Sequence, residues 1–237
     1  ERNPWEATAG DEDELRRKLA LFASYNTTSG NRLSGGGRII LTRPMTFSRP
    51  VIVSSPQVTI VQAAQFPLTA TTLLDCLFDV RAYNVTLEGI YFYAASAALL
   101  CTALVRATYD GVDFLTPTQL TMTRCSAYCD RIFVDDSAGN ASYARVLDCH
   151  QAELNATHGA PIYLNSYGQR ARGNSLIDGG GDSITVGATG EACEVSFNDC
   201  GGGDITTSAS LGFNAIVGNT KTGARTIAGT DQQAANT

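Results

Sequence analysis

Aspartate and histidine side chains recur at a regular interval near the middle of the chain. Asp113 is followed by Asp135 and Asp136 and then by His158, so the step from 113 to 135 equals the step from 136 to 158. If the chain repeats its structure with that period, these side chains lie above one another. Two carboxyl groups about 6.5–9.5 Å or about 5–5.5 Å apart can hydrolyse a glycosidic bond with inversion or retention, respectively. The spacing indicates a candidate site for polysaccharide cleavage, although aspartate is also an ordinary turn residue.

Tyrosine side chains offer a second kind of sugar contact. Tyr91, Tyr93, Tyr128 and Tyr163 lie in or beside runs of β-prone residues. A tyrosine ring combines a large apolar face with a polar tip, which suits stacking against a sugar ring. The same residue type is common as a half-buried side chain on strands. The four tyrosines are therefore candidate substrate-binding residues, with plain strand packing as the alternative.

Neither a metal nor a cofactor is expected. The spacings Cys125-x3-Cys129 and Cys193-x6-Cys200 differ from those of zinc ribbons, and seven cysteines in a long chain indicate buried free thiols. Glycine-rich runs flanked by aspartate, at 178–182 and 199–204, allow two interpretations, a calcium-lined ridge or plain turns. We favour turns. A lyase is disfavoured, because calcium-dependent elimination needs a basic residue at the site and the chain has only 17 of them.

Composition and charge exclude several classes of partner. The formal net charge of −6 and the pI near 4.9 oppose binding to nucleic acid phosphates and to anionic membranes. The chain has no run of about 18 apolar residues, so membrane insertion is not expected. It has 43% hydrophobic residues, only 17% charged residues and 23 glycines. These values predict a folded, β-rich protein with many turns.

One helix and many short strands must position the candidate residues. Acidic residues at 11–14 precede Leu15, Leu19 and Phe22, whose spacing predicts an amphipathic helix of about three turns. From residue 38 onward, short β-prone runs are separated by Gly, Asn, Asp, Ser or Pro. The stretch VIVSSPQVTIV, residues 51–61, holds two such runs on either side of a corner at 54–56. The gap between these runs is too short for a helix, so alternating β and α units are not expected.

Similar β-prone runs recur along the chain, which favours a solenoid over a sandwich. Comparable runs begin at Ser175, Glu194 and Ala215, at nearly equal steps, and others begin at 58, 85 and 120, at longer steps that allow for larger loops. In a solenoid each strand pairs in parallel with its equivalents above and below, and an open end needs a cover. The sequence therefore predicts an all-β parallel β-helix. Its expected parts are an N-terminal arm and capping α-helix (1–37), the β-helix (38–220) and a C-terminal arm (221–237).

The start of the solenoid resembles that of pectate-lyase-like proteins. The glycine-rich run GGGRIIL at 35–41, followed by Val58-Thr59-Ile60, is similar to their entrance, and it implies a right-handed parallel β-helix. The order of Asp113, Asp135-Asp136 and His158-Gly159 resembles that of polygalacturonase-type glycosidases. That resemblance implies Asp113 and Asp136 as the carboxyl pair, Asp135 as a supporting carboxylate and His158 as an orienting group.

A sparsely charged β-helix of this length is also similar to virion-associated proteins such as tailspikes, fibres and capsid decoration proteins. That similarity implies a structural and adhesive protein, located on a virion or outside the cell. Its expected partners are two further copies in a homotrimer, other virion proteins and host surface polysaccharide. A polygalacturonase-like glycoside hydrolase is the first alternative. A secreted cell-surface β-helix glycosylated at Asn26, Asn84, Asn140 and Asn155 is the second.

Overall fold

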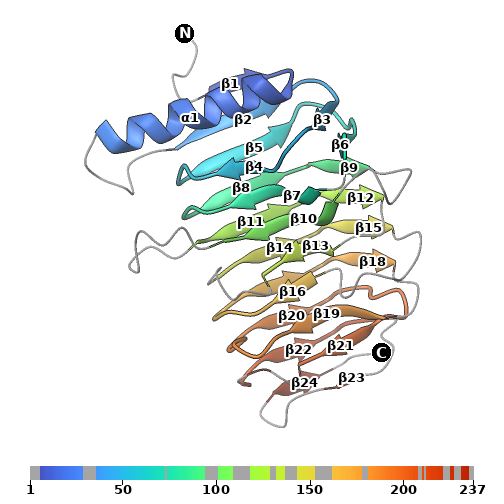
Figure 1. Cartoon of the computed structure of the whole chain (residues 1–237). Coiled ribbons are helices and arrows are strands. Elements are labelled where there is room, and N and C mark those ends of the chain that lie inside the picture. Colours follow the sequence, from blue (N-terminus) through green and yellow to red (C-terminus); the bar gives the residue numbers. More distant parts are fainter. Residues whose placement is uncertain are drawn as a thin grey trace.

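The chain winds as a right-handed parallel β-helix with one N-terminal α-helix, as the sequence predicts (Figure 1). The computed structural model describes residues 6–28, 36–72, 74–93, 101–108, 118–128, 132–136, 143–152, 162–177, 181–207, 210, 212–220, 225–226 and 231–234. Every strand pairing in this part of the chain is parallel, and the pairings build three sheets.

Sheet A is the longest of the three and runs from one end of the solenoid to the other. Its strands, in spatial order, are β1 (Glu6–Ala9), β2 (Gly37–Leu41), β5 (Val58–Gln62), β8 (Val85–Glu88), β11 (Leu120–Thr123), β14 (Arg145–Leu147), β17 (Arg170–Arg172), β20 (Glu194–Ser196), β22 (Ala215–Val217) and β24 (Gln232–Ala234).

Sheets B and C form the other two sides of the solenoid. Sheet B contains β3 (Met45–Phe47), β6 (Leu68–Ala70), β9 (Tyr91–Tyr93), β12 (Ser126–Tyr128), β15 (His150–Ala152) and β18 (Ser175–Ile177). Sheet C contains β4 (Val51–Val53), β7 (Leu74–Val80), β10 (Cys101–Ala107), β13 (Ile132–Asp135), β16 (Ile162–Leu164), β19 (Asp182–Val186), β21 (Asp204–Thr206) and β23 (Arg225–Thr226). The stretch 51–61 supplies β4 and β5, which belong to different sheets, so its expected corner at 54–56 is confirmed.

Helix α1 (Glu12–Thr28) covers the N-terminal end of the solenoid (Figure 1). Leu15, Leu19 and Phe22 are buried on its inner face, as predicted. Arg16 fixes its position, because its Nη1 donates to the carbonyl of Pro50 at 2.9 Å and its guanidinium also pairs with Glu12. The Phe22 ring occupies the space in front of Gly37, where an added Cβ would lie 2.6 Å from the ring. The helix therefore closes the first coil against water.

The interior of the N-terminal coils is filled by large apolar side chains. Phe47, Phe78 and Phe92 are fully buried and meet edge to face, with ring centroids 5.7 Å apart for the first pair and 6.2 Å for the second. These rings come from sheets B, C and B, so they fill the space between two sheets across three coils. Aromatic pairs of this geometry are favourable beyond the area that they bury.

Left-handed backbone residues mark both ends of five sheet A strands, β8, β14, β17, β20 and β22. Just before each of these strands lies a residue with a φ between +53° and +66°; these residues are Asn84, Tyr143, Gly168, Ala192 and Phe213. The residue after each strand has a φ between +53° and +69°; these residues are Gly89, Asp148, Gly173, Phe197 and Gly218. The span between the two positions is the same on each of these strands. At two of these corners an aromatic ring lies against the glycine of the next coil. An added Cβ on Gly168 would lie 2.8 Å from Tyr143, and one on Gly218 would lie 2.7 Å from Phe197.

Buried asparagines form a hydrogen-bonded ladder in the C-terminal coils. Asn174 Nδ2 donates to Asn198 Oδ1 at 2.9 Å, and Asn198 Nδ2 donates to Asn219 Oδ1 at 2.8 Å. Each amide also bonds the backbone, as when Asn198 Oδ1 accepts from the Asn174 N–H at 3.0 Å. The ladder satisfies polar groups at the corner between sheets A and B.

Two expectations about the repeat differ from the structure. Ser175 belongs to sheet B, and the sheet A partner of Glu194 in the preceding coil is Arg170. The alignment of Ser175 with Glu194 was therefore wrong, whereas the alignment of Glu194 with Ala215 and that of the runs at 58, 85 and 120 are confirmed. Beyond residue 220, in the segment expected to be a C-terminal arm, β23 and β24 continue the pairing of sheets C and A.

Candidate functional site

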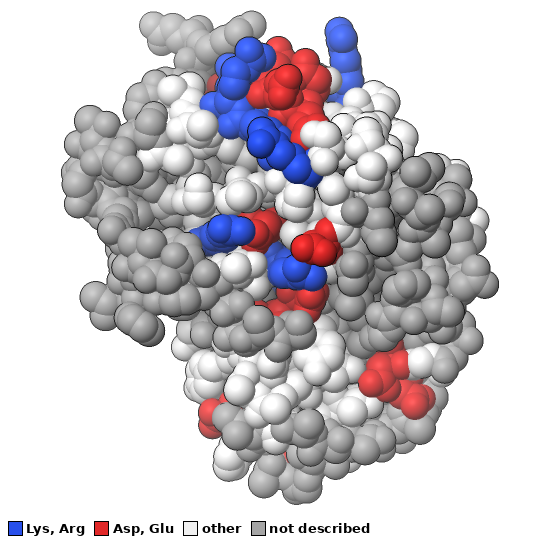
Figure 2. All heavy atoms as spheres, viewed as in Figure 1, with Lys and Arg blue, Asp and Glu red and all other residues white. Residues whose placement is uncertain are grey.

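A row of aligned side chains, three of them charged, follows the outer face of sheet C. Strand register places Ile52, Asp79, Arg106, Asp135 and Tyr163 above one another on consecutive coils. Neighbouring strands lie about 4.8 Å apart, so each side chain of the row can reach the next. Figure 2 shows acidic and basic side chains interleaved in the middle of the face that it presents. We call these five residues the sheet C row.

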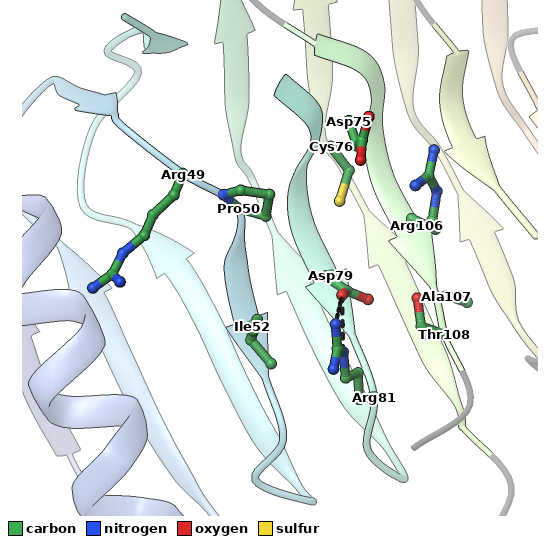
Figure 3. A pocket seen from close by; sticks show the side chains of 10 residues that line it. All are labelled: Arg49, Pro50, Ile52, Asp75, Cys76, Asp79, Arg81, Arg106, Ala107 and Thr108. Carbon is green, nitrogen blue, oxygen red and sulfur yellow. Dashed lines mark hydrogen bonds and ion pairs between the residues drawn. The ribbon is translucent and has the colours of Figure 1, made fainter. Parts of the chain in front are cut away.

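The N-terminal half of the row lies beside a hollow of about 510 Å³ (Figure 3). Its lining comes from β4, β7, β10 and the adjoining residues, and it includes Pro50, Ile52, Cys76, Asp79, Arg81 and Arg106. A volume of this size is within the range of small-ligand pockets, about 300–1,000 Å³. In Figure 3 the Arg49 side chain, also on the rim, extends toward α1, whereas Asp79 and Arg81 face each other. The hollow thus combines apolar carbon with fixed charges.

Asp79 is the most unusual group in the hollow. Its residue is 7% exposed, and its Oδ2 accepts from Arg81 Nε at 2.8 Å and from Arg81 Nη2. Its second oxygen, Oδ1, is buried, and no donor from the described residues reaches it. A buried acceptor without a donor costs about 1–3 kcal/mol, more when the group is charged. Because Asp79 also lines the hollow, this oxygen is a candidate acceptor for a hydrogen bond from a ligand.

Arg106 continues the row on the next coil. Its Nε donates to Asp135 Oδ2 at 3.2 Å. Burial opposes the charge of Arg106, but the hydrogen bond and the charge of Asp135 outweigh it, so the pKa of Arg106 is raised. The guanidinium therefore stays charged and stays paired.

The Cys76 thiol faces the same hollow and is 3% exposed. Burial, with the negative charge of Asp79 as the next cause, raises the pKa of Cys76 to about 12. The thiolate is the nucleophilic form of cysteine, so this side chain stays protonated and inert at neutral pH. The charged groups that a ligand in the hollow would meet therefore include Asp79, Arg81 and Arg106, and the thiol contributes shape.

The candidate carboxylates do not converge in the described part of the chain. Asp135 faces outward in the sheet C row, whereas Asp136 is 1% exposed and its Oδ2 accepts from Gln169 Nε2 at 2.7 Å. Asp136 follows β13 at the register position that Leu164 and Val186 fill in the next two coils, and both of these are buried. Asp135 and Asp136 therefore point to opposite faces of sheet C.

Asp113 and His158, the other two members of the candidate catalytic set, lie outside the described residues.

The candidate tyrosines divide between two faces. Tyr91, Tyr93 and Tyr128 lie together on the outer face of sheet B, where the Tyr93 and Tyr128 rings stack with centroids 5.8 Å apart and an interplanar angle of 12°. The ring centroids of Tyr91 and Tyr93 lie 6.2 Å apart. Tyr163 lies on sheet C, where an added Cβ on Gly187 of the next coil would approach its ring to 2.9 Å. The structure therefore brings three of the four tyrosines together.

The described residues contain no group of three or more His, Cys, Asp or Glu able to hold a metal ion. Asp182 and Asp204, from the two glycine-rich runs, face each other in register on β19 and β21. The carboxylate of Asp182 accepts from the hydroxyls of Thr185 and Thr206, each at 3.0 Å, so it is bonded by side chains of strands β19 and β21. Among these residues, no helix has both the length and the apolar character needed to cross a bilayer.

Comparison of the chain with models of known families, with curated proteins and with solved structures gives no match in any of the three. The parallel β-helix is the part of the expected resemblance that the structure confirms.

The sequence contained a signal for the hollow that periodicity alone did not reveal. Asp79 and Arg81 flank Val80 at the end of the apolar run LDCLFDV, and alternate residues in a strand point to the same face. An acid and a base on either side of one apolar residue, beside such a run, indicate a charged outer face. The equivalent charges of Arg106 and Asp135 lie one and two coils beyond Asp79. Their alignment becomes visible only when the strand register is known.

Proposed function

We propose that this protein is a structural and adhesive protein of the virion-associated type, which binds host surface polysaccharide on the outer face of sheet C. The single observation that carries the binding part is Asp79, which lines the hollow and whose buried Oδ1 has no donor from the described residues. A sugar hydroxyl is a donor of the right size and supplies the missing hydrogen bond. The chemistry of the hollow thus favours a polyhydroxylated ligand.

The geometry of the solenoid supports a polymer rather than an isolated small molecule. The sheet C row repeats at about 4.8 Å along the axis and continues through Asp135 and Tyr163 beyond the hollow. An extended chain that enters the hollow can therefore continue along the same face. Tyr91, Tyr93 and Tyr128 on sheet B form a separate aromatic surface, which this proposal does not require.

The setting on a virion or outside the cell, the homotrimer and the contact with other virion proteins belong to the same proposal. They are supported by the parallel β-helix fold and by the low share of charged residues, 17%. Flat strand faces with few charges suit packing against neighbouring chains, because few charged groups lose water on contact. Sedimentation of the full chain tests the trimer directly.

Binding without cleavage is favoured over the polygalacturonase-like alternative. Hydrolysis needs two carboxyl groups on either side of one glycosidic bond. Asp135 faces outward and bonds Arg106, whereas Asp136 faces the core and bonds Gln169. Asp136, one member of the carboxyl pair that the resemblance implies, therefore points away from a ligand on the outer face, and Asp113, the other member, lies outside the described residues.

The test is a binding screen of the full chain against an array of neutral and acidic cell-surface polysaccharides, followed by an assay for new reducing ends. We expect saturable binding to at least one polysaccharide and no release of reducing ends. Absence of binding across the array would overturn the adhesive function. Release of reducing ends that is abolished by Asp135→Asn would establish the hydrolase instead.

A further inference from the structure

The charges around the hollow are arranged so that they neutralise one another. Asp79 pairs with Arg81, and Arg106 pairs with Asp135. Both carboxylates are largely buried, with side chains 10% and 9% exposed, so the guanidinium groups beside them are needed to stabilise their charge. The other two charged residues of the lining, Arg49 and Asp75, are opposite in sign, so the hollow has fixed dipoles but no excess of either sign.

Such a floor disfavours a charged ligand of either sign. A uronate or sulfate group beside Asp79 would meet the carboxylate charges of Asp79 and Asp75, and Arg81 already gives Nε and Nη2 to Asp79. An ammonium group would meet the guanidinium groups of Arg81 and Arg106. At short range in a partly buried site, a like charge costs several times what it costs in bulk water. An uncharged donor avoids both penalties.

Apolar surface beside the ion pairs completes the site. Pro50 and Ile52 line the hollow, and Ile52 is 46% exposed, which is high for a large apolar side chain. The C–H groups of a sugar ring can pack on this surface while a hydroxyl or amide N–H points at Asp79 Oδ1. Small-ligand sites commonly combine such an apolar wall with a few fixed polar groups.

We propose that the sugar unit held in the hollow is uncharged, a neutral or N-acetylated sugar that donates one hydrogen bond to Asp79 Oδ1 and packs on Pro50 and Ile52. This inference rests on the proposed polysaccharide binding and narrows it to a ligand class. It excludes uronates, sulfated sugars and free amino sugars from this position.

Matched ligands test the inference most sharply. Polygalacturonate oligomers and their carboxyl-reduced counterparts, α-1,4-linked galactose oligomers, differ only at C6, where a hydroxymethyl group replaces a carboxylate. N-acetylated and deacetylated glucosamine oligomers differ by an acetyl group and one positive charge per unit. We expect the full chain to bind the uncharged member of a pair more tightly. Its affinity should change by less than about twofold between about 0.05 and 0.5 M NaCl, because screening acts only on charged ligands.

Variants locate the effect. Asp79→Asn keeps the shape but removes the charged acceptor, so affinity should fall about tenfold or more. Asp13→Asn makes the same change at an exposed position on α1 and should leave affinity unchanged. Thermal unfolding of Asp79→Asn checks that the fold persists. Ile52→Lys, at an exposed position, should instead create salt-sensitive binding of polygalacturonate, since it adds an unmatched cation.

The outcomes separate this inference from the proposed function. Preference of the natural chain for an acidic oligomer, lost at high salt, would overturn the neutral ligand while supporting polysaccharide binding. Unchanged affinity of a folded Asp79→Asn would remove the hollow as the site. Binding of no oligomer and no polysaccharide on the array would overturn both.

Discussion

The N-terminal and C-terminal coils are held together by different interactions. Around Phe47, Phe78 and Phe92 the interior is aromatic, and all three sheets are complete. Below β18 the described part of sheet B is reduced to isolated bridges at Asp199 and Thr220, and the buried amide ladder connects the coils at that corner.

The difference shows what a solenoid coil needs. Each coil must bury its inward side chains and must satisfy its backbone groups through the neighbouring coils. Where strands are long, the sheets satisfy the backbone and the interior can be apolar. Where a strand shortens to a bridge, side-chain amides take over the hydrogen bonds between coils, at the cost of apolar volume.

The largest expected effect is loss of the aromatic packing. Phe78→Ala should lower the free energy of unfolding by about 3–5 kcal/mol, because it removes a fully buried ring that contacts two others. Chemical denaturation monitored by circular dichroism measures the change. Leu21→Ala, at a side chain that is 43% exposed on α1, should change stability by less than about 0.5 kcal/mol. Equal effects of the two substitutions would contradict the packing argument.

Breaking the amide ladder should lower the free energy of unfolding somewhat less than Phe78→Ala does. Asn198→Ala removes the acceptor of the Asn174 N–H and Nδ2 and the side-chain donor to the Ala171 carbonyl, and it should destabilise the fold by about 3 kcal/mol. Hydrogen exchange should increase first in β20 and β22. Asn198→Asp keeps the acceptor but loses the donor and adds a buried charge, so it should be at least as destabilising as alanine. If Asn198→Ala leaves the free energy of unfolding unchanged, the ladder contributes only shape.

Alkaline pH should weaken both regions through their buried thiols. Burial raises the pKa of Cys76 to about 12 and that of Cys193 to about 11, from an ordinary value of 9.0. The unfolded chain loses these protons first, so the stability due to the thiols is full below pH 9 and falls as pH rises toward 11–12. At pH 10 each thiol should have lowered the free energy of unfolding by about 1 kcal/mol. Cys193→Ala should reduce this dependence in pH-dependent denaturation curves. If the free energy of unfolding of Cys193→Ala falls with pH as steeply as that of the natural chain, the Cys193 thiol is not a cause of the dependence.

The smallest effect on the free energy of unfolding should come from loss of an ion pair on the outer face. Arg170 Nε lies 2.6 Å from Glu194 Oε2 on sheet A, with side chains 44% and 28% exposed. Exposed ion pairs contribute about 0–1 kcal/mol, so Arg170→Gln should change the free energy of unfolding by about 0.5 kcal/mol. The change should shrink further in about 1 M NaCl. A loss as large as that of Asn198→Ala would place the inter-coil stability on the surface instead of the interior.

The sequence predicted the elements that carry strong periodic apolar patterns. The stripe of Leu15, Leu19 and Phe22 predicted α1, and the runs at 58, 85 and 120 predicted consecutive sheet A strands. Strands such as β17, Arg170–Arg172, escaped prediction because three residues with one inward alanine carry almost no pattern. Without β17, the run at Ser175 was matched to Glu194 in the wrong sheet.

The candidate site was harder to predict than the fold. Asp135 and Asp136 were treated as members of one site, although adjacent residues at a strand end point to opposite faces, and this rule was available from the sequence. The hollow depends on the register of Asp79 against Arg106 in the next coil, and that register is set by the core packing of both strands. Local pattern contains no information about a pairing between positions so far apart in the chain.

The constant span between paired left-handed residues also has a practical use. From 84 and 89 to 213 and 218 this span never changes, while the chain between equivalent strands is much longer from Val85 to Leu120 than from Glu194 to Ala215. Length variation is therefore accommodated at the other corners of each coil. For protein engineering, peptides should be grafted there, and the segments between paired left-handed residues should be kept as the invariant frame of a designed scaffold.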